Sequence, residues 1–179
     1  LSAVAAGTGG FVINGQSAGD FSGRSVASAG DVNGDGLADL IVGAPWSDPA
    51  AGVDAGRSYV IFGKASTTAI DLSAVAAGTG GFVINGQSAD DNSGSSVATA
   101  GDINGDGLAD LIIGANGSDP TAGANAAGRS YVVFGKAGTA AINLSAVAAG
   151  TGGFVINGQC AFDLSGSSVA AAGDVNGDG

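Results

Sequence analysis

Two nine-residue segments carry closely spaced side chains with oxygen ligands. Residues 31–39 read DVNGDGLAD, residues 102–110 read DINGDGLAD, and a third copy, DVNGDG, begins at residue 174. Each complete segment has Asp or Asn at positions 1, 3 and 5, and Asp again at position 9. Calcium takes six to eight oxygen ligands, and alternating positions of a tight loop can point toward one centre. The spacing therefore predicts a calcium site in each segment.

Each complete segment is expected to supply four side chains and the main-chain carbonyl of position 7. The glycine at position 6 permits the sharp turn that brings this carbonyl inward. The predicted ligands are Asp31, Asn33, Asp35, Leu37 and Asp39 in the first segment, and Asp102, Asn104, Asp106, Leu108 and Asp110 in the second. The third segment offers Asp174, Asn176 and Asp178 but lacks positions 7 and 9, so a site confined to it is expected to be empty or weak.

Three other interpretations fit these segments less well. An EF-hand needs a bidentate Glu at position 12, where this chain has Val42 inside an apolar run. A hairpin turn with incidental acids would not need Asp at positions 1, 5 and 9 of both segments. Magnesium usually keeps several waters, whereas this cage would consist of protein oxygens. These comparisons favour calcium.

The composition excludes several classes of function. The chain has 179 residues, is 45% hydrophobic, and carries a formal net charge of −11 with five Lys plus Arg. Such an acidic surface repels phosphate backbones and anionic lipid, so neither nucleic acid binding nor membrane insertion is expected. With one Cys and no His, the chain cannot form a Ser-His or Cys-His catalytic pair, and a zinc site is not expected. We therefore do not expect an enzyme.

The chain is an internal repeat with a long period. The sequence LSAVAAGTGGFVINGQ occurs at 1–16, 72–87 and 144–159. A repeat of this length is a supersecondary unit that buries its faces against neighbouring units. Short runs rich in Val, Ile, Tyr and Phe, bounded by Gly, Asn, Asp or Pro, predict strands. In one unit these runs are 25–30, 39–44, 58–63 and 81–86.

Four antiparallel strands per unit, stacked unit on unit, predict an all-β fold of β-propeller blades. The chain would hold about two and a half blades, an incomplete propeller. The expected parts are an outer strand of a preceding blade in 1–21, one blade each in 22–92 and 93–164, and the first strand and partial calcium loop of a further blade in 165–179. The end strands, 10–16 and 167–173, should lack partners. A β-solenoid is the competing repeat architecture, although its turns are usually shorter.

These residues resemble a known family. The stretch SVASAGDVNGDGLADLIVGAP (25–45), followed by SYVIFGK (58–64), is similar to the FG-GAP repeat, the blade unit of integrin α-subunit propellers and of many secreted bacterial proteins. The second copy departs from it with Asn116 in place of the Pro of the GAP element. The resemblance implies calcium loops between strands one and two, and seven blades in an integrin-type propeller. A longer parent protein or an assembly of chains would supply the missing blades.

The repeats diverge from one another in two sets of loops. They differ at 17–23, 88–94 and 160–166, and at 45–56 compared with 116–128. In the family these loops between strands four and one and between strands two and three share a face that binds partners. The contact candidates are Trp46, Phe21, Asp90 and Phe162, although neutral drift at exposed loops is an alternative for each. Arg57, Arg129, Lys64 and Lys136 recur at equivalent positions, and we expect them to pair with local carboxylates.

The combined expectation is a calcium-binding propeller segment of a secreted or cell-surface protein that acts in adhesion, through protein or glycan ligands. Millimolar calcium outside cells suits such sites. A structural repeat of an extracellular fibre or surface layer is the main alternative. A non-catalytic propeller attached to a secreted hydrolase is a further one.

Overall fold

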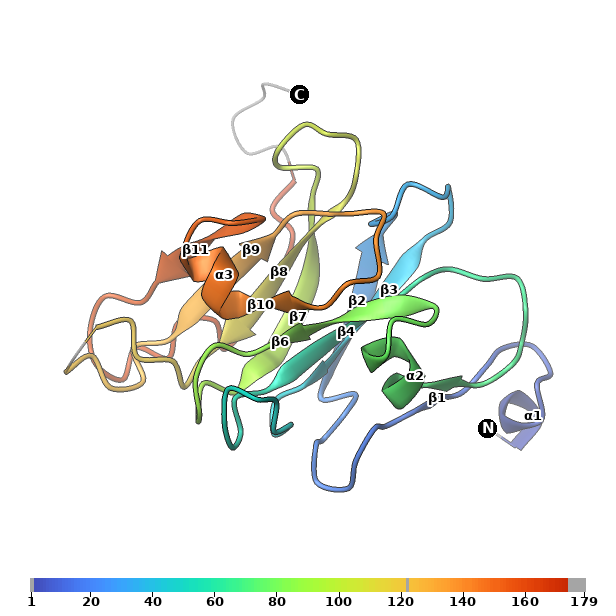
Figure 1. Ribbon diagram of the computed structural model, residues 1–179, viewed down its shortest axis with the longest axis horizontal. Helices are drawn as coiled ribbons and strands as arrows, with labels where there is room; N and C mark the ends of the chain where they lie inside the picture. Colours follow the sequence, from blue (N-terminus) through green and yellow to red (C-terminus); the bar gives the residue numbers. More distant parts are fainter. Residues whose placement is uncertain (1, 122, 174–179) are drawn as a thin grey trace.

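The computed structural model describes residues 2–121 and 123–173, which form two main sheets, each with four antiparallel strands (Figure 1). The first sheet contains β2 (Ser25–Gly30), β3 (Asp39–Ala44), β4 (Arg57–Ile61) and β6 (Gly81–Asn85); the second contains β7 (Ser93–Gly101), β8 (Asp110–Ala115), β9 (Arg129–Val133) and β11 (Gly153–Asn157). Within each sheet, these strands pair in chain order. The all-β fold and the four strands expected for each repeat are thus confirmed.

A fifth, shorter strand links consecutive repeats at the periphery, and the sequence did not predict it. β10 (Ile142–Asn143) of the second repeat pairs in parallel with β6 of the first. In the same way β5 (Ile70–Asp71) pairs in parallel with β1 (Ile13–Asn14). Both short strands lead directly into one-turn helices, α2 (Leu72–Ala76) and α3 (Leu144–Ala148), which resemble the N-terminal α1 (Ser2–Ala5).

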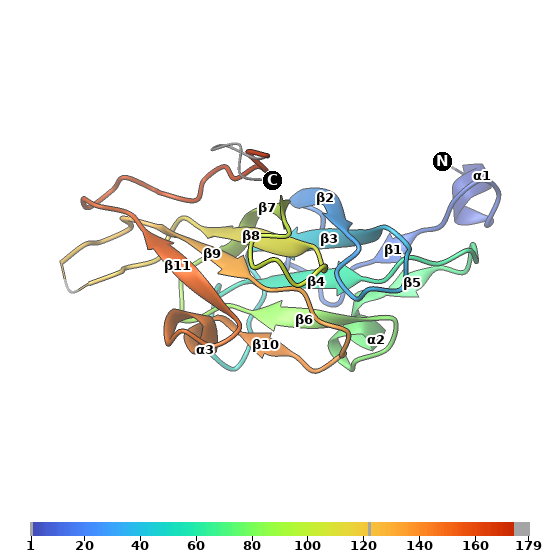
Figure 2. The same cartoon turned by 90° about the horizontal axis from the view of Figure 1, so that it is seen from above.

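Two hydrophobic cores cover the two faces of the first sheet. One core lies between the two sheets, which Figure 2 shows from above. There, side chains such as Ile41 and Phe82 pack with Leu111 and Tyr131. On the other face, Val42, Tyr59 and Val83 pack with Leu72 and Val75 of α2. A sheet buried on both faces explains why its strands read as near-continuous apolar runs.

Paired glycines set the distance between the two sheets. A Cβ atom on Gly43 of β3 would lie 2.1 Å from the carbonyl oxygen of Gly94, which belongs to the next sheet. The equivalent pair repeats the contact, because a Cβ on Gly114 would lie 1.9 Å from the carbonyl oxygen of Gly166. Gly94 and Gly166 also have φ values of 88° and 85°, which disfavour other residues. Only glycine therefore permits this approach of one backbone to the next.

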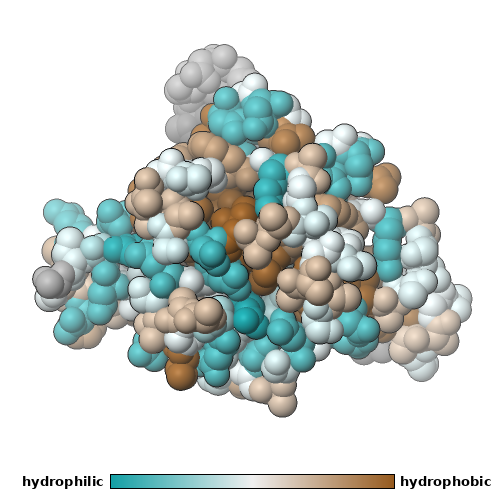
Figure 3. Space-filling view, in the orientation of Figure 1, coloured by the Kyte–Doolittle hydropathy of each residue, from teal (hydrophilic) through white to brown (hydrophobic). Residues whose placement is uncertain are grey.

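The outer faces of the two sheets are less completely covered than the faces that pack between the sheets. Val26 is 64% exposed, whereas its counterpart Val97 in the second sheet is 4% exposed. Phe154 of β11 is 41% exposed, whereas its counterpart Phe82 is fully buried. Figure 3 shows hydrophobic surface among hydrophilic regions on one face of the molecule.

The two expected end strands are short or not formed. Within 10–16 only Ile13–Asn14 is a strand, and residues 167–173, where an inner strand was expected, adopt no regular secondary structure. A strand needs a hydrogen-bonding neighbour, and no strand pairs with these segments within the described residues apart from β5. The predicted division into blades at 1–21, 22–92, 93–164 and 165–179 stays a prediction. The helices of the described part are single turns, too short to cross a bilayer.

Candidate functional site

The two complete acidic segments form the hairpin connections between the first and second strands of each sheet. Residues 31–38 join β2 to β3, and residues 102–109 join β7 to β8. Both loops project from the same edge of the molecule, at the top of Figure 1. The loop placement that the resemblance implied is therefore present in this structure.

The first acid of each loop organises the turn around its carboxylate. Asp31 accepts main-chain N–H groups of Gly34 at 2.8 Å and Asp35 at 3.1 Å on Oδ1, and of Gly36 at 2.9 Å on Oδ2. In the second loop Asp102 makes the same three hydrogen bonds, to residues 105, 106 and 107, at 2.8, 3.1 and 2.8 Å. The equivalent loops of two successive repeats thus wrap one carboxylate in the same way.

In each loop, the amide side chain at position 3 lies beside the carboxylate at position 5. The Nδ2 group of Asn33 donates to Oδ2 of Asp35 at 2.9 Å, and Oδ1 of Asp35 accepts the N–H of Leu37 at 2.8 Å. Asn104 and Asp106 repeat this arrangement at 2.8 Å. Asp35 lies at the surface, and Asn33 is half-buried.

The last acid of each loop has a structural role that the sequence analysis missed. Asp39 is 1% exposed; its Oδ2 accepts the N–H of Val32 at 2.9 Å and its Oδ1 that of Gly63 at 2.8 Å. Asp110 makes the same contacts, to Ile103 and Gly135, each at 2.8 Å. Each carboxylate therefore fastens its loop to the segment that follows the third strand. In the sequence, this role could have been recognised from an acid placed directly at the start of an apolar strand.

Electrostatics around Asp39 indicate an excess of negative charge. Burial raises the pKa of this carboxyl, and the nearby carboxylates of Asp35 and Asp31 raise it further. The hydrogen bonds from Gly63 and Val32 act in the opposite direction. Three like charges around one turn are a setting that a divalent cation would relieve.

The donor chemistry of the loops fits a hard cation, but the carboxylates do not form a preassembled cluster. Among residues 2–121 and 123–173, no three acidic, imidazole or thiol side chains converge as a metal-binding group. The side chains of Asp31, Asn33 and Asp35 offer oxygen donors near the surface, and both oxygens of Asp39 already accept hydrogen bonds. The third-loop residues Asp174, Asn176 and Asp178 lie outside the described residues.

The two acidic loops contact each other across the interface between the sheets. The carbonyl oxygen of Asp31 accepts the N–H of Ala109, in the second loop, at 2.9 Å. Its neighbour Val32 is fully buried, and its carbonyl accepts the N–H of Lys136 at 2.9 Å. Ile103, the counterpart of Val32, is 50% exposed. The first loop is thus supported by the second sheet.

The recurring basic residues contact aromatic rings and amide oxygens, whereas pairing with carboxylates was expected. Nζ of Lys136 lies 4.6 Å from the ring centre of Phe82, and Nζ of Lys64 lies 4.8 Å from that of Phe11. The guanidinium of Arg129 donates to Oε1 of Gln87 at 2.9 Å, and Nε of Arg57 donates to an amide oxygen of Asn85 at 3.3 Å. Each Lys belongs to one repeat and its ring to the preceding one, so the contact holds neighbouring repeats together.

At the opposite edge from the acidic loops, two of the four candidate contact residues lie side by side. The rings of Phe21 and Trp46 have centroids 4.1 Å apart and are tilted by 59°. Both are about half exposed, and Phe21 has a φ of 54°, an uncommon value for an aromatic residue. They come from the loops that precede β2 and follow β3.

The other two candidates occupy equivalent positions of the next two loops. Asp90 donates its N–H to the carbonyl of Val53 at 2.9 Å, and Phe162 donates to that of Asn125 at 2.8 Å. Both have positive φ, 63° and 67°, and Phe162 is 72% exposed. Each loop between strands four and one is therefore held against a loop between strands two and three.

Each of these loops also contains a carboxyl that sequence comparison did not single out. Asp91, next to Asp90, is 4% exposed, and its Oδ2 accepts the N–H of Ser88 at 3.0 Å. Burial raises the pKa of Asp91, and the nearby charge of Arg129 lowers it. The equivalent Asp20 is 7% exposed, and its Oδ2 has no hydrogen-bond partner within the described residues. The buried carboxylate of Asp91 therefore supports its loop through the N–H of Ser88.

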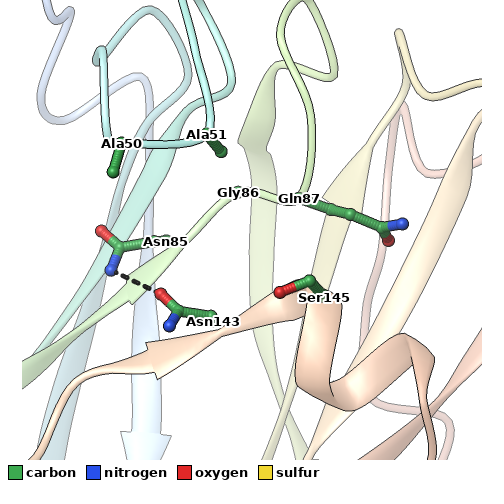
Figure 4. A pocket seen from close by; sticks show the side chains of 7 residues that line it. All are labelled: Ala50, Ala51, Asn85, Gly86, Gln87, Asn143 and Ser145. Carbon is green, nitrogen blue, oxygen red and sulfur yellow. Dashed lines mark hydrogen bonds between the residues drawn. The ribbon is translucent and has the colours of Figure 1, made fainter.

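A small polar cavity lies at the junction of the two repeats (Figure 4). It has a volume of about 290 Å³ and is lined by Ala50, Ala51, Asn85, Gly86, Gln87, Asn143 and Ser145. Nδ2 of Asn85 donates to Oδ1 of Asn143 at 3.0 Å, as the dashed line shows. The lining carries no charged side chain. It could hydrogen-bond a neutral polar group.

Comparison with known proteins gives two results. A family model described as the FG-GAP repeat matches residues 22–61 and 93–133. Integrin alpha-PS2 of Drosophila melanogaster is 33% identical over 130 residues, which cover 70% of this chain but only 8% of the integrin. Each family match begins at or just before the first strand of a sheet and ends at the third, so it contains the acidic hairpin. With the repeated strands, the acidic hairpins and the glycine pairs, these matches show that the chain is built from FG-GAP repeats and that its two sheets are β-propeller blades.

Proposed function

We propose that this chain is a calcium-binding segment of an extracellular FG-GAP propeller that acts in adhesion. The observation that carries the proposal is the pair of acidic hairpins, which have the same donor spacing and the same hydrogen bonds in both repeats. A bare turn needs no such repetition of acids. The match to an integrin α-subunit supports a location at the cell surface or outside the cell, where millimolar calcium is present.

The residues that would hold calcium are those of the two complete loops. Asp31, Asn33 and Asp35 would supply side-chain oxygens, with the Leu37 carbonyl and Asp39 completing the set; Asp102, Asn104, Asp106, Leu108 and Asp110 would do the same in the second loop. Calcium would supply positive charge among carboxylates that otherwise repel one another. Because Asp39 and Asp110 also anchor the second strand, the ion would stabilise each hairpin.

Partner binding is assigned to the loops at the opposite edge. The exposed pair Phe21 and Trp46 offers an aromatic surface, and Asp90 and Phe162 continue the same series of loops. Aromatic side chains are common energetic centres of protein interfaces, and they also stack on sugars. A protein or glycan ligand is therefore proposed, whereas the net charge of −11 disfavours nucleic acid.

A non-enzymatic role accompanies this proposal, since the chain has no His for a Ser-His or Cys-His pair. A propeller attached to a secreted hydrolase would still be compatible with it, because the chemistry would reside in another domain. The alternative is a structural repeat of an extracellular fibre or surface layer, since blades of near-identical sequence can pack on one another.

Calcium binding is testable by calorimetry and thermal unfolding on the intact chain. We expect about two sites per chain and a higher melting temperature in millimolar calcium than in chelator. At a hundredfold excess over the dissociation constant, binding to the folded state alone stabilises by about 2.7 kcal/mol per site. No heat of binding at millimolar calcium would refute the metal sites.

The variant Asp35→Asn removes one charge from the first loop and should abolish one of the two sites. Asp90→Asn is the matched control, because it removes the same charge from an exposed position in the other set of loops. The control should bind two ions and keep its calcium-dependent stabilisation. Equal calorimetric titrations for the two variants would show that the acidic loops are only turns.

A further inference from the structure

We propose that Asn143 carries an N-linked oligosaccharide when the chain passes through a secretory compartment that contains an oligosaccharyl transferase. This residue opens the sequence Asn143-Leu144-Ser145, which has the form N-x-S with x other than Pro. Sequences of this form accept glycans at the surface of secreted proteins. The inference rests on the extracellular location in the proposed function, and it involves neither the acidic hairpins nor the loops assigned to partner binding.

The acceptor residue lies at the periphery of the molecule, where β10 leads into α3. Asn143 is the N-cap residue of α3, and its side chain makes no capping hydrogen bond. Its backbone is extended, with φ of −107° and ψ of 127°. Asn143 and Ser145 are both exposed. The two side chains that define the acceptor sequence are therefore accessible to solvent in the folded chain.

One hydrogen bond orients the amide group of Asn143. Its Oδ1 accepts Nδ2 of Asn85 at 3.0 Å, so the oxygen faces β6 of the first sheet. The Nδ2 atom of Asn143 points away from Asn85 in Figure 4. An N-linked sugar is attached to Nδ2 and leaves the amide oxygen in place. The bond to Asn85 can thus persist in the modified protein.

The cavity of about 290 Å³ at this junction offers a neutral polar surface to the first sugar. Asn143 and Ser145 form one side of it, and Asn85 and Ala51 lie across from them (Figure 4). A sugar ring is uncharged and carries hydroxyl groups that both donate and accept hydrogen bonds. No charged side chain lines the cavity, so a sugar at its rim would not desolvate a charge.

The modification forms one bond and breaks another. Nδ2 of Asn143 attacks the anomeric carbon of an oligosaccharide carried on a polyprenyl diphosphate, and an N-glycosidic bond forms. The bond between that carbon and the diphosphate oxygen breaks, and the lipid diphosphate leaves with the electron pair. Nδ2 loses one of its two protons. The co-reactant is therefore a lipid-linked oligosaccharide, and the step needs neither an oxidant nor a reductant.

A second sequence of the same form, Asn116-Gly117-Ser118, is less suited to carry a glycan. Asn116 is half-buried, and the side chain of Ser118 is fully buried. The N–H of Gly117 donates to the carbonyl of Asp91 at 3.1 Å, which fixes this turn against the loop that precedes β7. A glycan there would meet a packed loop. We therefore expect Asn116 to remain unmodified.

The first repeat provides a matched position that lacks the acceptor. Asp71 takes the place of Asn143, and the same Leu-Ser pair follows it. It is likewise an N-cap with extended backbone, φ of −101° and ψ of 123°, and no capping hydrogen bond. Its Oδ1 accepts Nδ2 of Asn14 at 2.8 Å. Asp71→Asn therefore creates a second acceptor sequence and keeps the oxygen that accepts this bond.

Expression of the whole chain behind a cleavable signal peptide in eukaryotic secretory cells tests the proposal. Intact mass before and after enzymatic release of N-glycans, in the cell-associated and secreted fractions, should show one oligosaccharide per chain, and peptide mapping should place it on Asn143. Ser145→Ala should abolish it. Ser73→Ala is the matched control at the equivalent exposed position of α2, and it should keep the oligosaccharide. Asp71→Asn should raise the number to two.

Three results would overturn the proposal. The parent chain could be unmodified in both fractions, it could carry its oligosaccharide on Asn116, or Ser145→Ala could leave the modification unchanged. If Asp71→Asn is modified while the parent chain is not, the surroundings of Asn143 block the transferase. Calcium titration of chain produced without glycans tests the proposed function separately, so either proposal can fail while the other stands.

Discussion

Asp39 and Asp110 combine a predicted ligand position with an observed structural role. Each oxygen of Asp39 accepts one main-chain N–H, from Val32 and Gly63, inside the protein. Removing an acceptor from a buried donor costs about 1–3 kcal/mol. The carboxylate therefore contributes to the fold whether or not a cation is bound.

Asp39→Ala should lower the free energy of unfolding in both calcium and chelator, by about 2–4 kcal/mol, because two buried N–H groups lose their acceptors. Asp35→Ala should lower it only in calcium, since Asp35 lies at the loop surface. Urea denaturation under both conditions measures the difference. A loss for Asp39→Ala that vanishes in chelator would show that its hydrogen bonds contribute nothing and that it acts solely as a ligand.

Asp91 should make stability depend on pH. Because burial raises the pKa of Asp91, the folded protein retains a proton that the unfolded chain has already released. The contribution of this residue to the free energy of unfolding therefore falls as the pH rises above about 4, the ordinary value for Asp.

Asp91→Asn removes this titration while keeping an amide oxygen for the N–H of Ser88. Relative to the parent chain, the variant should gain stability as the pH rises from about 4 toward neutrality. Urea denaturation at several pH values follows the difference between the two proteins. Parallel curves over the whole range would mean that the Asp91 carboxyl has the same pKa in the folded and unfolded states.

At the scale of elements, the two acidic hairpins form a physically connected pair. Ala109 of the second hairpin donates to Asp31 of the first, and Ala109 precedes the anchor Asp110. An ion that orders the second hairpin would therefore also fix Ala109, whose N–H group holds the first hairpin at Asp31. Such coupling must act equally in both directions.

Asp106→Asn, placed in the second hairpin, should weaken calcium binding at the first by about fivefold, the lower end of typical coupling between sites. Asp35→Asn should weaken binding at the second by the same factor. Titration of each single-site variant, compared with the parent chain, yields both values. Independent sites, with the remaining affinity unchanged in both variants, would exclude communication through Ala109.

Much of the element structure followed from the sequence, since four apolar runs between turn residues correspond to four strands in each repeat. Two features did not follow. The short strands β5 and β10 arise because an outer strand of the preceding repeat offers them an edge, which no local pattern records. Lys64 and Lys136 lie over rings from the preceding repeat, a contact that depends on packing between blades.

At the candidate site, too, the sequence predicted local features but not the contacts between distant segments. The spacing of Asp31, Asn33 and Asp35 located the hairpin and its tight turn, because these are local properties. The anchoring of Asp39 to Gly63 joins residues on opposite sides of two strands, and only the fold brings them together. The pairing of Phe21 with Trp46 across two loops is of the same kind.

At the scale of the whole molecule, stability depends on how closely the blades approach. Gly43→Ala should destabilise the protein severely, by about 3 kcal/mol or more, because the new Cβ would lie 2.1 Å from the carbonyl oxygen of Gly94. Gly138→Ala is the matched control, since a Cβ there would meet no atom within 4 Å. Thermal unfolding of both variants measures the difference. Similar melting temperatures would show that the two blades can separate without loss.

Each glycine pair joins two different repeats, so the contact that sets the packing distance does not lie within one sequence repeat. Gly43 of one blade meets Gly94 of the next, and Gly114 meets Gly166 beyond the second blade, so a substitution in one repeat is felt in its neighbour. Insertion or loss of one whole repeat leaves each glycine facing another. A tandem duplication of one whole repeat could thus lengthen the chain without creating a misfit, whereas a deletion that removed one of these glycines would leave its partner unmatched.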